Sequence, residues 1–198
     1  MMRAIHCDIL DLKMLIQKHA YRQGVFTLTS GRKSSFYVDM KKVALMPLGQ
    51  YLIGNVICKT ITSLTPNVQA VAGVELGAVP LVDATCLISQ VRKFQCYCQK
   101  NFSLLPGILI RKKVKEHGTA GRLEIGAGTP SGVKVALLED VVTTGGSVLN
   151  IGIPAMEEAG FSVEIILAIV DRQEGGREKI EKAGYKFHSI FTKKDIVK

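Results

Sequence analysis

Two adjacent acidic residues and the short loop after them form the most informative stretch of the sequence, residues 135–148. Four apolar residues lead into Glu139 and Asp140, and the loop that follows is rich in Thr, Gly and Ser. Backbone N–H groups, hydroxyls and a helix start together make a site for an anion such as phosphate. Carboxylates repel phosphate, so the acidic pair must face either a neutral group that carries hydroxyls or a metal ion. A ribose phosphate meets both demands.

The same stretch also fits a plainer interpretation, a helix-capping loop that follows two incidental acids. A nucleoside triphosphatase is disfavoured, because no Lys follows Gly145 and Gly146 as it does in a phosphate-binding P-loop. In open parallel sheets, ligands bind at the carboxyl ends of the strands. We therefore predict a ligand site where the strand before Glu139 ends.

A basic, glycine-rich segment lies between Arg111 and Lys134, where no apolar pattern persists. We expect a long loop without regular structure, of the kind that covers a site. Its cations can stabilise negative charge that develops on a bound anion, and His117 can also donate a proton. The alternative is a solvated basic loop that binds nothing in particular.

A third candidate is Arg172, which follows a predicted strand within the segment Asp171-Arg-Gln-Glu174. A guanidinium group binds a carboxylate through two parallel hydrogen bonds. Arg172 is therefore a candidate to bind a carboxylate group. The alternative is an ordinary surface Arg after a strand.

Apolar strands alternate with helical segments from about residue 46 onward, which predicts an α/β fold with a parallel sheet covered on both faces. The predicted strands are 68–74, 93–99, 107–110, 133–138, 162–170 and 185–191. The predicted helices are 47–63, 78–89, 146–159 and 176–183. A helix that ends near Ala20 and two short strands precede them. We expect a single domain over residues 1–198, with a distinct first part of about 45 residues.

The composition is that of a globular protein, with 47% hydrophobic and 22% charged residues. The 26 Lys and Arg residues exceed the 17 Asp and Glu residues and give a net charge of +9, which favours anionic partners. No apolar run is long enough to cross a membrane, and the N-terminus lacks the apolar core of a signal peptide. The five cysteines include no Cys-x-x-Cys pair, so we expect reduced thiols, no zinc site and a cytoplasmic location.

Residues 135–148 resemble the phosphoribosyl-diphosphate (PRPP) binding motif of the type I phosphoribosyltransferases, an apolar strand, two acidic residues and a small hydroxyl- and glycine-rich loop. The resemblance implies that Glu139 and Asp140 bind the ribose 2- and 3-hydroxyls and that the loop binds the 5-phosphate. It also implies a parallel sheet flanked by helices. A small N-terminal hood, about residues 1–45, would cover a PRPP-binding α/β core of about residues 46–198.

Four further segments are similar to the orotate phosphoribosyltransferases within that family, namely residues 26–39, 73–80, 111–118 and 171–174. The resemblance implies a pentosyltransferase of UMP biosynthesis that converts orotate and PRPP into orotidine 5'-monophosphate and diphosphate. It implies Mg²⁺ as the cofactor, and this ion retains waters and prefers phosphate oxygens, so we name no protein metal ligand. Some members carry Lys where this chain has Thr29 and Gly77.

The resemblance assigns roles residue by residue. The catalytic candidates are Lys115, His117 and Asp140. The predicted PRPP contacts are Arg111, Lys112, Lys115, His117, Glu139, Asp140, Val141, Val142, Thr143, Thr144, Gly145, Gly146 and Ser147. The predicted orotate contacts are Thr143 and Arg172. In the family, part of the basic loop reaches the partner subunit's site, which implies a homodimer with shared sites.

Two alternatives stay open. One is a phosphoribosyltransferase for a purine or another base, which Arg172 and the segment Phe36-Tyr37-Val38 argue against. The other is a PRPP- or nucleotide-sensing regulator that binds RNA or DNA, which the net charge permits. The basic segment has neither interleaved aromatic residues nor a recognition helix, so we expect small-molecule substrates, with no nucleic-acid or membrane partner.

Overall fold

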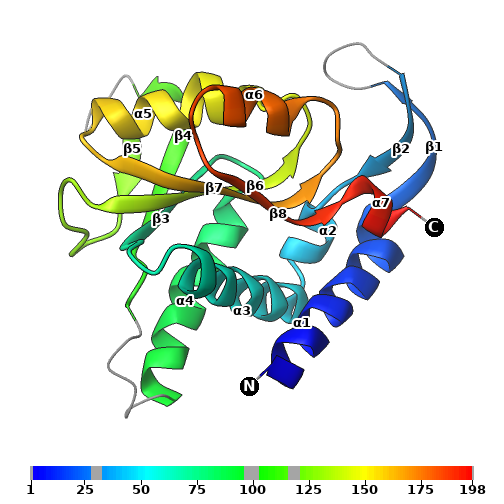
Figure 1. Ribbon diagram of the computed structural model, residues 1–198, viewed down its shortest axis with the longest axis horizontal. Coiled ribbons are helices and arrows are strands. Elements are labelled where there is room, and N and C mark those ends of the chain that lie inside the picture. The colour runs from blue at the N-terminus through cyan, green and yellow to red at the C-terminus, as the bar shows by residue number, and fades with distance from the viewer. Residues whose placement is uncertain (1, 28–32, 96–102, 116–120, 198) are drawn as a thin grey trace.

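The computed structural model describes residues 2–27, 33–95, 103–115 and 121–197 and centres on a six-stranded sheet (Figure 1). Its strand order is β5-β4-β3-β6-β7-β8. The strands are β3 (Ala70–Val74), β4 (Gly107–Lys115), β5 (Gly121–Ile125), β6 (Lys134–Val142), β7 (Ser162–Asp171) and β8 (Phe187–Thr192). All neighbours pair in parallel except β4 and β5, which are antiparallel. The predicted α/β class is confirmed.

Helices cover both faces of this sheet, as Figure 1 shows. On one side lie α3 (Pro47–Leu64) and α4 (Val79–Gln95), with α1 (Met2–Leu15) beside α3. On the other side lie α5 (Ile153–Glu158), the π-helical turn η2 (Val148–Gly152) before it, and α6 (Gly176–Lys182). Successive strand residues point to opposite faces, so Leu137 and Leu138 of β6 belong to two separate buried clusters. Burial on both faces explains why the strands read as continuous apolar runs.

The N-terminal part forms a separate two-stranded unit. After α1 come the π-helical η1 (Ile16–Ala20), the antiparallel strands β1 (Tyr21–Thr27) and β2 (Lys33–Val38), and the short α2 (Lys41–Ala44). The last helix, α7 (Lys193–Ile196), lies near α1 and this hairpin, and Gln17 Nε2 donates to the Ile196 carbonyl at 3.2 Å. The proposed division of the chain near residue 45 stays a prediction.

The predicted strand 93–99 is wrong for residues 93–95, which continue α4 to Gln95. Its positions 96–99 lie outside the described residues. The error arose because a short alternating pattern does not distinguish a strand from a helix end. Phe94, an apolar residue of the predicted strand, is 67% exposed at this end of α4.

The expectation of an irregular segment from Arg111 to Lys134 is also wrong in part. The strand β4 continues to Lys115, and β5 returns along it as the edge of the sheet. Arg111 and Glu124 form an ion pair across the two strands at 2.8 Å. An edge strand buries few side chains, so β5 carries too little apolar pattern to be recognised from the sequence. No described helix is both long and apolar enough to cross a membrane.

Candidate active site

A pocket of about 330 Å³ opens at the carboxyl ends of β3 and β6, where the sequence placed a ligand site. The pocket is lined by residues from α2, β3 and the turn after it, β4 and β6, and by the loop that follows β6 (residues 143–147, the phosphate loop). They are Lys41, Val74, Glu75, Leu76, Gly77, Lys112, Glu139, Asp140, Val141 and Ser147. Glu139 and Asp140 lie within β6, which extends to Val142, rather than after the strand. The strand itself therefore fixes the positions of both residues.

Glu139 and Asp140 differ in their surroundings although they are adjacent. The Glu139 side chain is buried, and its Oε1 accepts the Asp140 backbone N–H at 3.2 Å. Burial, and then the neighbouring charge of Asp140, raise the pKa of the Glu139 carboxyl well above its usual value. Asp140 is partly exposed, and its Oδ1 accepts the Val141 backbone N–H at 2.8 Å. Ligand hydroxyls or a cation would therefore stabilise the charged form of Glu139.

Asp140 also packs closely against the turn that follows β3. A Cβ atom at Gly77 would lie 2.5 Å from Asp140 Oδ2, which is closer than any real contact. The Lys that some relatives carry at this position would therefore force the Asp140 carboxylate to move. In this chain, glycine lets Asp140 lie against the turn.

Two lysines bring positive charge to the same pocket. Lys41 Nζ pairs with Asp39 Oδ1 at 2.9 Å, and its pKa is raised by that hydrogen bond and further by the charge of Asp140. The backbone N–H of Lys112 donates to Glu75 Oε1 at 2.8 Å, which ties β4 to the turn after β3. The pocket thus combines carboxylates and cations, as a bound sugar diphosphate requires.

The phosphate loop runs from Thr143 to Ser147 and is held from behind by α6. Gly145 has a φ of +77° and its carbonyl accepts the Leu149 N–H at 2.9 Å. A Cβ at Gly176, the first residue of α6, would lie 2.6 Å from the Thr143 carbonyl oxygen. Only glycine lets α6 approach the loop this closely.

Arg172 lies at the boundary between the core and the N-terminal hairpin. Its side chain is 3% exposed, its Nη2 pairs with Glu174 Oε1 at 2.9 Å, and its Cζ lies 4.6 Å from the centre of the Phe36 ring. Its backbone N–H donates to Val142 at the end of β6 at 2.9 Å. The guanidinium is therefore held by contacts from both parts of the chain, Glu174 of the core and Phe36 of the hairpin.

Some of the residues predicted from the sequence line the pocket, and others lie beside it or outside the described residues. Lys112, Glu139, Asp140, Val141 and Ser147 line the pocket together. Thr143, Thr144, Gly145 and Gly146 form the adjoining loop, and Val142 is buried. Arg111 pairs with Glu124, Lys115 ends β4, and His117 lies outside the described residues.

Sequence reasoning did not assign Glu75 or Lys41 to the site. Glu75 belongs to the segment 73–80 whose resemblance was noticed, but nothing in its spacing indicates a contact with Lys112. Lys33, Lys41 and Lys42 lie close together in the sequence, and their spacing does not indicate which of them reaches the site. Lys41 of α2 and Glu75, which directly follows β3, come together in this pocket only in the folded chain. Within the described ranges, no group of three or more His, Cys, Asp or Glu side chains is arranged to hold a metal ion.

No family model matches the chain, but named proteins and solved structures are similar to it. The chain is 39% identical to an orotate phosphoribosyltransferase of Nostoc sp. over 92% of its length and 82% of the relative's. It is 39% identical to one from Sorangium cellulosum over 94% and 91% of the two lengths. Its fold matches the crystal structure of Mycobacterium tuberculosis orotate phosphoribosyltransferase in complex with Fe(III) dicitrate, with a TM-score of 0.76, 27% identity and 96% and 98% coverage.

Proposed function

Because this chain belongs to the orotate phosphoribosyltransferase family, we propose that the pocket at the end of β6 is the PRPP site of its reaction. The enzyme transfers the phosphoribosyl group of PRPP to orotate and releases orotidine 5'-monophosphate and diphosphate, a step of pyrimidine biosynthesis. The observation that supports the site is the acidic pair of β6, which shares one pocket with Lys41, Lys112 and the phosphate loop.

The acidic pair orients the ribose. Glu139 and Asp140 accept hydrogen bonds from the 2- and 3-hydroxyls, while the N–H groups and hydroxyls of residues 143–147 hold the 5-phosphate. These contacts lie on opposite sides of the sugar, so they fix its ring before the bond at C1 breaks. Positioning of this kind supplies much of the rate of a transfer that needs little covalent help.

The cations act on the diphosphate. As diphosphate leaves, negative charge accumulates on its oxygens and positive charge on the ribosyl centre. Lys112 lines the pocket, and Lys115 is the last residue of the same strand. Preorganised cations aimed at this charge stabilise the transition state. We propose that His117 also stabilises the negative charge of the leaving diphosphate. As a histidine in the same basic segment, it can in addition donate a proton to the leaving group.

We propose Mg²⁺ as the cofactor. The carboxylates of Glu75, Glu139 and Asp140 and the hydroxyl of Ser147 are oxygen ligands of the kind that Mg²⁺ accepts, but in the described part of the chain they do not form a cluster that could hold the ion alone. The ion fits as one carried mainly by PRPP oxygens and water, with the acidic pair facing its hydration shell. Bound in this way, it would neutralise diphosphate charge.

Orotate recognition is assigned to the boundary between hairpin and core. Arg172 would bind the orotate carboxylate, and Thr143 in the phosphate loop would contact the ring. The 4.6 Å distance between Arg172 Cζ and the centre of the Phe36 ring supports this assignment, because it places the guanidinium against the hairpin. The ring nitrogen of orotate then attacks C1 from the side opposite to the diphosphate.

We propose that the enzyme is a homodimer whose sites are shared. Leu45, Leu48 and Tyr51 follow one another at three-residue spacing beside α2 and are 68%, 53% and 54% exposed. Exposed apolar residues gathered in this way are typical of an interface. Lys41 in α2 lines the pocket, so this surface adjoins the site.

The free thiols of Cys7, Cys58 and Cys86 support a cytoplasmic location.

An absorbance assay of orotate tests the proposed function. The purified protein with Mg²⁺ should consume orotate only when PRPP is present, and chelation of Mg²⁺ by EDTA should stop the reaction reversibly. Adenine and uracil serve as competing acceptors in parallel reactions. Equal use of adenine would favour the purine enzyme, and PRPP binding without consumption of any base would favour a regulator.

A further inference from the structure

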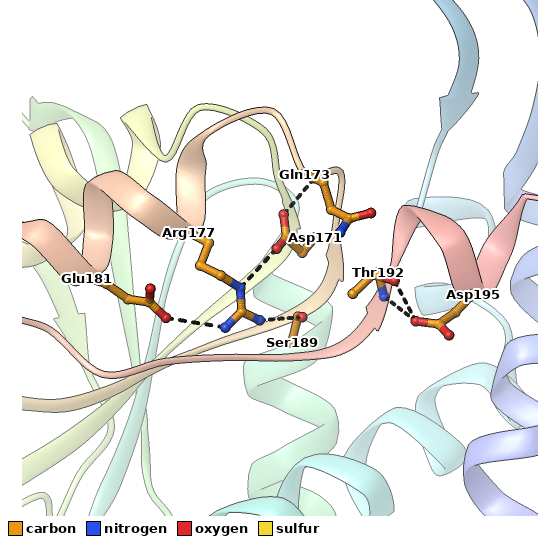
Figure 2. A network of polar contacts seen from close by, with 7 residues as sticks. All are labelled: Asp171, Gln173, Arg177, Glu181, Ser189, Thr192 and Asp195. Atoms are coloured by element: carbon orange, nitrogen blue, oxygen red, sulfur yellow. Dashed lines mark hydrogen bonds and ion pairs between the residues drawn. The ribbon is translucent and has the colours of Figure 1, made fainter.

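A polar network around the buried Asp171 lies next to Arg172 in the sequence, and the proposed function does not use it (Figure 2). Its centre is Asp171, the last residue of β7, whose side chain is 2% exposed. Asp171 Oδ1 accepts the Gln173 backbone N–H at 2.8 Å, and Oδ2 pairs with Arg177 Nε at 3.4 Å. One carboxylate therefore contacts the residues on both sides of the turn that carries Arg172.

Arg177 of α6 is in turn held on several sides. Its Nη1 pairs with Glu181 Oε1 at 3.3 Å, its Nη2 donates to Ser189 Oγ of β8 at 3.3 Å, and its Cζ lies 4.8 Å from the centre of the Phe187 ring. Figure 2 shows Glu181 of α6, Ser189 of β8 and Asp171 of β7 around the guanidinium. A planar guanidinium can satisfy all of them at once, whereas an ammonium group cannot.

The turn between Asp171 and Arg177 needs such support because its backbone is unusual. Gln173 has a φ of +56° and Gly175 a φ of +88°, and the first of these is rare for a residue with a side chain. The hydrogen bond from Gln173 to Asp171 is the local contact that favours this conformation. If the Asp171 carboxylate rotates, the turn loses the contact that fixes the direction of Arg172.

We propose that Asp171 and Arg177 form a positioning pair that aims the Arg172 guanidinium at the substrate carboxylate. The inference rests on the proposed function, because it assumes that Arg172 binds orotate. Arg177 touches no substrate in this account and acts only through Asp171 and the turn. It is therefore a positioning residue and determines the affinity for orotate, while PRPP is held by β6 and the phosphate loop.

The test measures the Michaelis constants of Arg177→Met for both substrates. We expect the constant for orotate to rise about tenfold, since small misplacement of a positioning group is costly, and the constant for PRPP to stay within about twofold. The Michaelis constant of Arg177→Lys for orotate should lie between those of the unmodified protein and Arg177→Met. Lys179→Met is the matched control, because it removes an exposed cation from the same helix and should change neither constant.

The double variant separates positioning from general damage to the fold. In an Arg172→Ala background, Arg177→Met should add almost nothing to the constant for orotate, because the group that it positions is already gone. If the two substitutions raise the Michaelis constant for orotate independently, so that their fold-changes multiply in the double variant, the proposal is wrong. An equal rise in the Michaelis constants for orotate and PRPP in Arg177→Met would also overturn it. If Arg177→Met does not fold, as judged by circular dichroism, Ser189→Ala removes one of its supports and should give a smaller change of the same kind.

The proposed function fails in a different way. If the unmodified protein does not consume orotate with PRPP, the assumed reaction is wrong. If it does, and Arg177→Met leaves the orotate constant unchanged, only the positioning role is wrong.

Discussion

The unequal environments of Glu139 and Asp140 are the clearest property of the site at the scale of single residues. Glu139 is buried and its pKa is raised, whereas Asp140 faces the pocket. A buried acid of this kind holds its proton to higher pH than usual. A ligand that presents hydroxyls and a cation favours the charged carboxylate, so binding and deprotonation are coupled.

PRPP binding should therefore release a proton from Glu139. Affinity for PRPP with Mg²⁺ should fall as the pH is lowered through the raised pKa of Glu139, because the protonated acid no longer matches the ligand. Calorimetry in buffers of different ionisation enthalpy measures the release directly. Glu139→Gln should abolish the proton release that accompanies PRPP binding. An unchanged proton release in this variant would show that another group titrates.

Arg172 is the residue that should decide between orotate and uracil. Arg172→Ala should raise the Michaelis constant for orotate by about 10- to 100-fold, the size of a lost charge-assisted hydrogen bond, and affect the constant for PRPP far less. Steady-state kinetics with each substrate varied in turn gives both constants. Lys194→Ala, which removes an exposed cation from α7, is the control. If the unmodified enzyme uses uracil as well as orotate, Arg172 does not recognise a carboxylate.

At the scale of secondary structure, the phosphate loop depends on the close approach of α6. The start of α6 lies against the Thr143 carbonyl and the Val142 side chain, where a Cβ at Gly176 would be 2.6 and 2.5 Å away. A methyl group there must displace backbone, not merely the end of a flexible side chain.

Gly176→Ala should therefore lower both stability and PRPP affinity. We expect a loss of about 1–3 kcal/mol in the free energy of unfolding, typical of overpacking, together with weaker PRPP binding because the loop shifts. Denaturant unfolding and calorimetry measure the two effects. Lys182→Ala, at an exposed position of the same helix, should change neither. A Gly176→Ala protein with normal PRPP affinity would show that the loop does not depend on α6.

The elements themselves were predictable where burial leaves a pattern. The strands β3, β6 and β7 are buried on both faces, so their apolar runs identified them and placed Glu139 and Asp140 at the right end of the sheet. The edge strand β5 buries little and was missed. The end of α4 was mistaken for a strand because its pattern is short. Glu75 and Lys41 could not be assigned, because their place in the pocket depends on how separate elements pack.

At the scale of the whole molecule, the account predicts that two chains share each site. Lys115 ends β4, while Asp140 lies in the pocket of its own chain. If the basic loop serves the partner's pocket, Lys115→Ala and Asp140→Asn chains, each nearly inactive alone, should restore activity when combined. A random mixture should recover about a quarter of normal activity, because half the dimers are hybrids with one intact site.

Co-expression of the two variants followed by the orotate assay tests this sharing, and mass spectrometry verifies that hybrids form. Lys113→Ala, which removes a neighbouring exposed cation of β4, is the control for Lys115→Ala and should retain activity alone. If verified hybrids show no recovery, the loop serves its own subunit or Lys115 is not catalytic.

The most direct test of the central claim, that the acidic pair of β6 binds the ribose of PRPP, is calorimetry of PRPP with Mg²⁺ on four proteins. They are the unmodified enzyme, Glu139→Gln, Asp140→Asn and the control Asp83→Asn, which alters an exposed acid of α4. The account predicts that the two site variants lose about 10- to 100-fold in affinity, because a neutral amide cannot replace a charge-assisted hydrogen bond, while Asp83→Asn binds normally. Unchanged PRPP affinity in both site variants would contradict it.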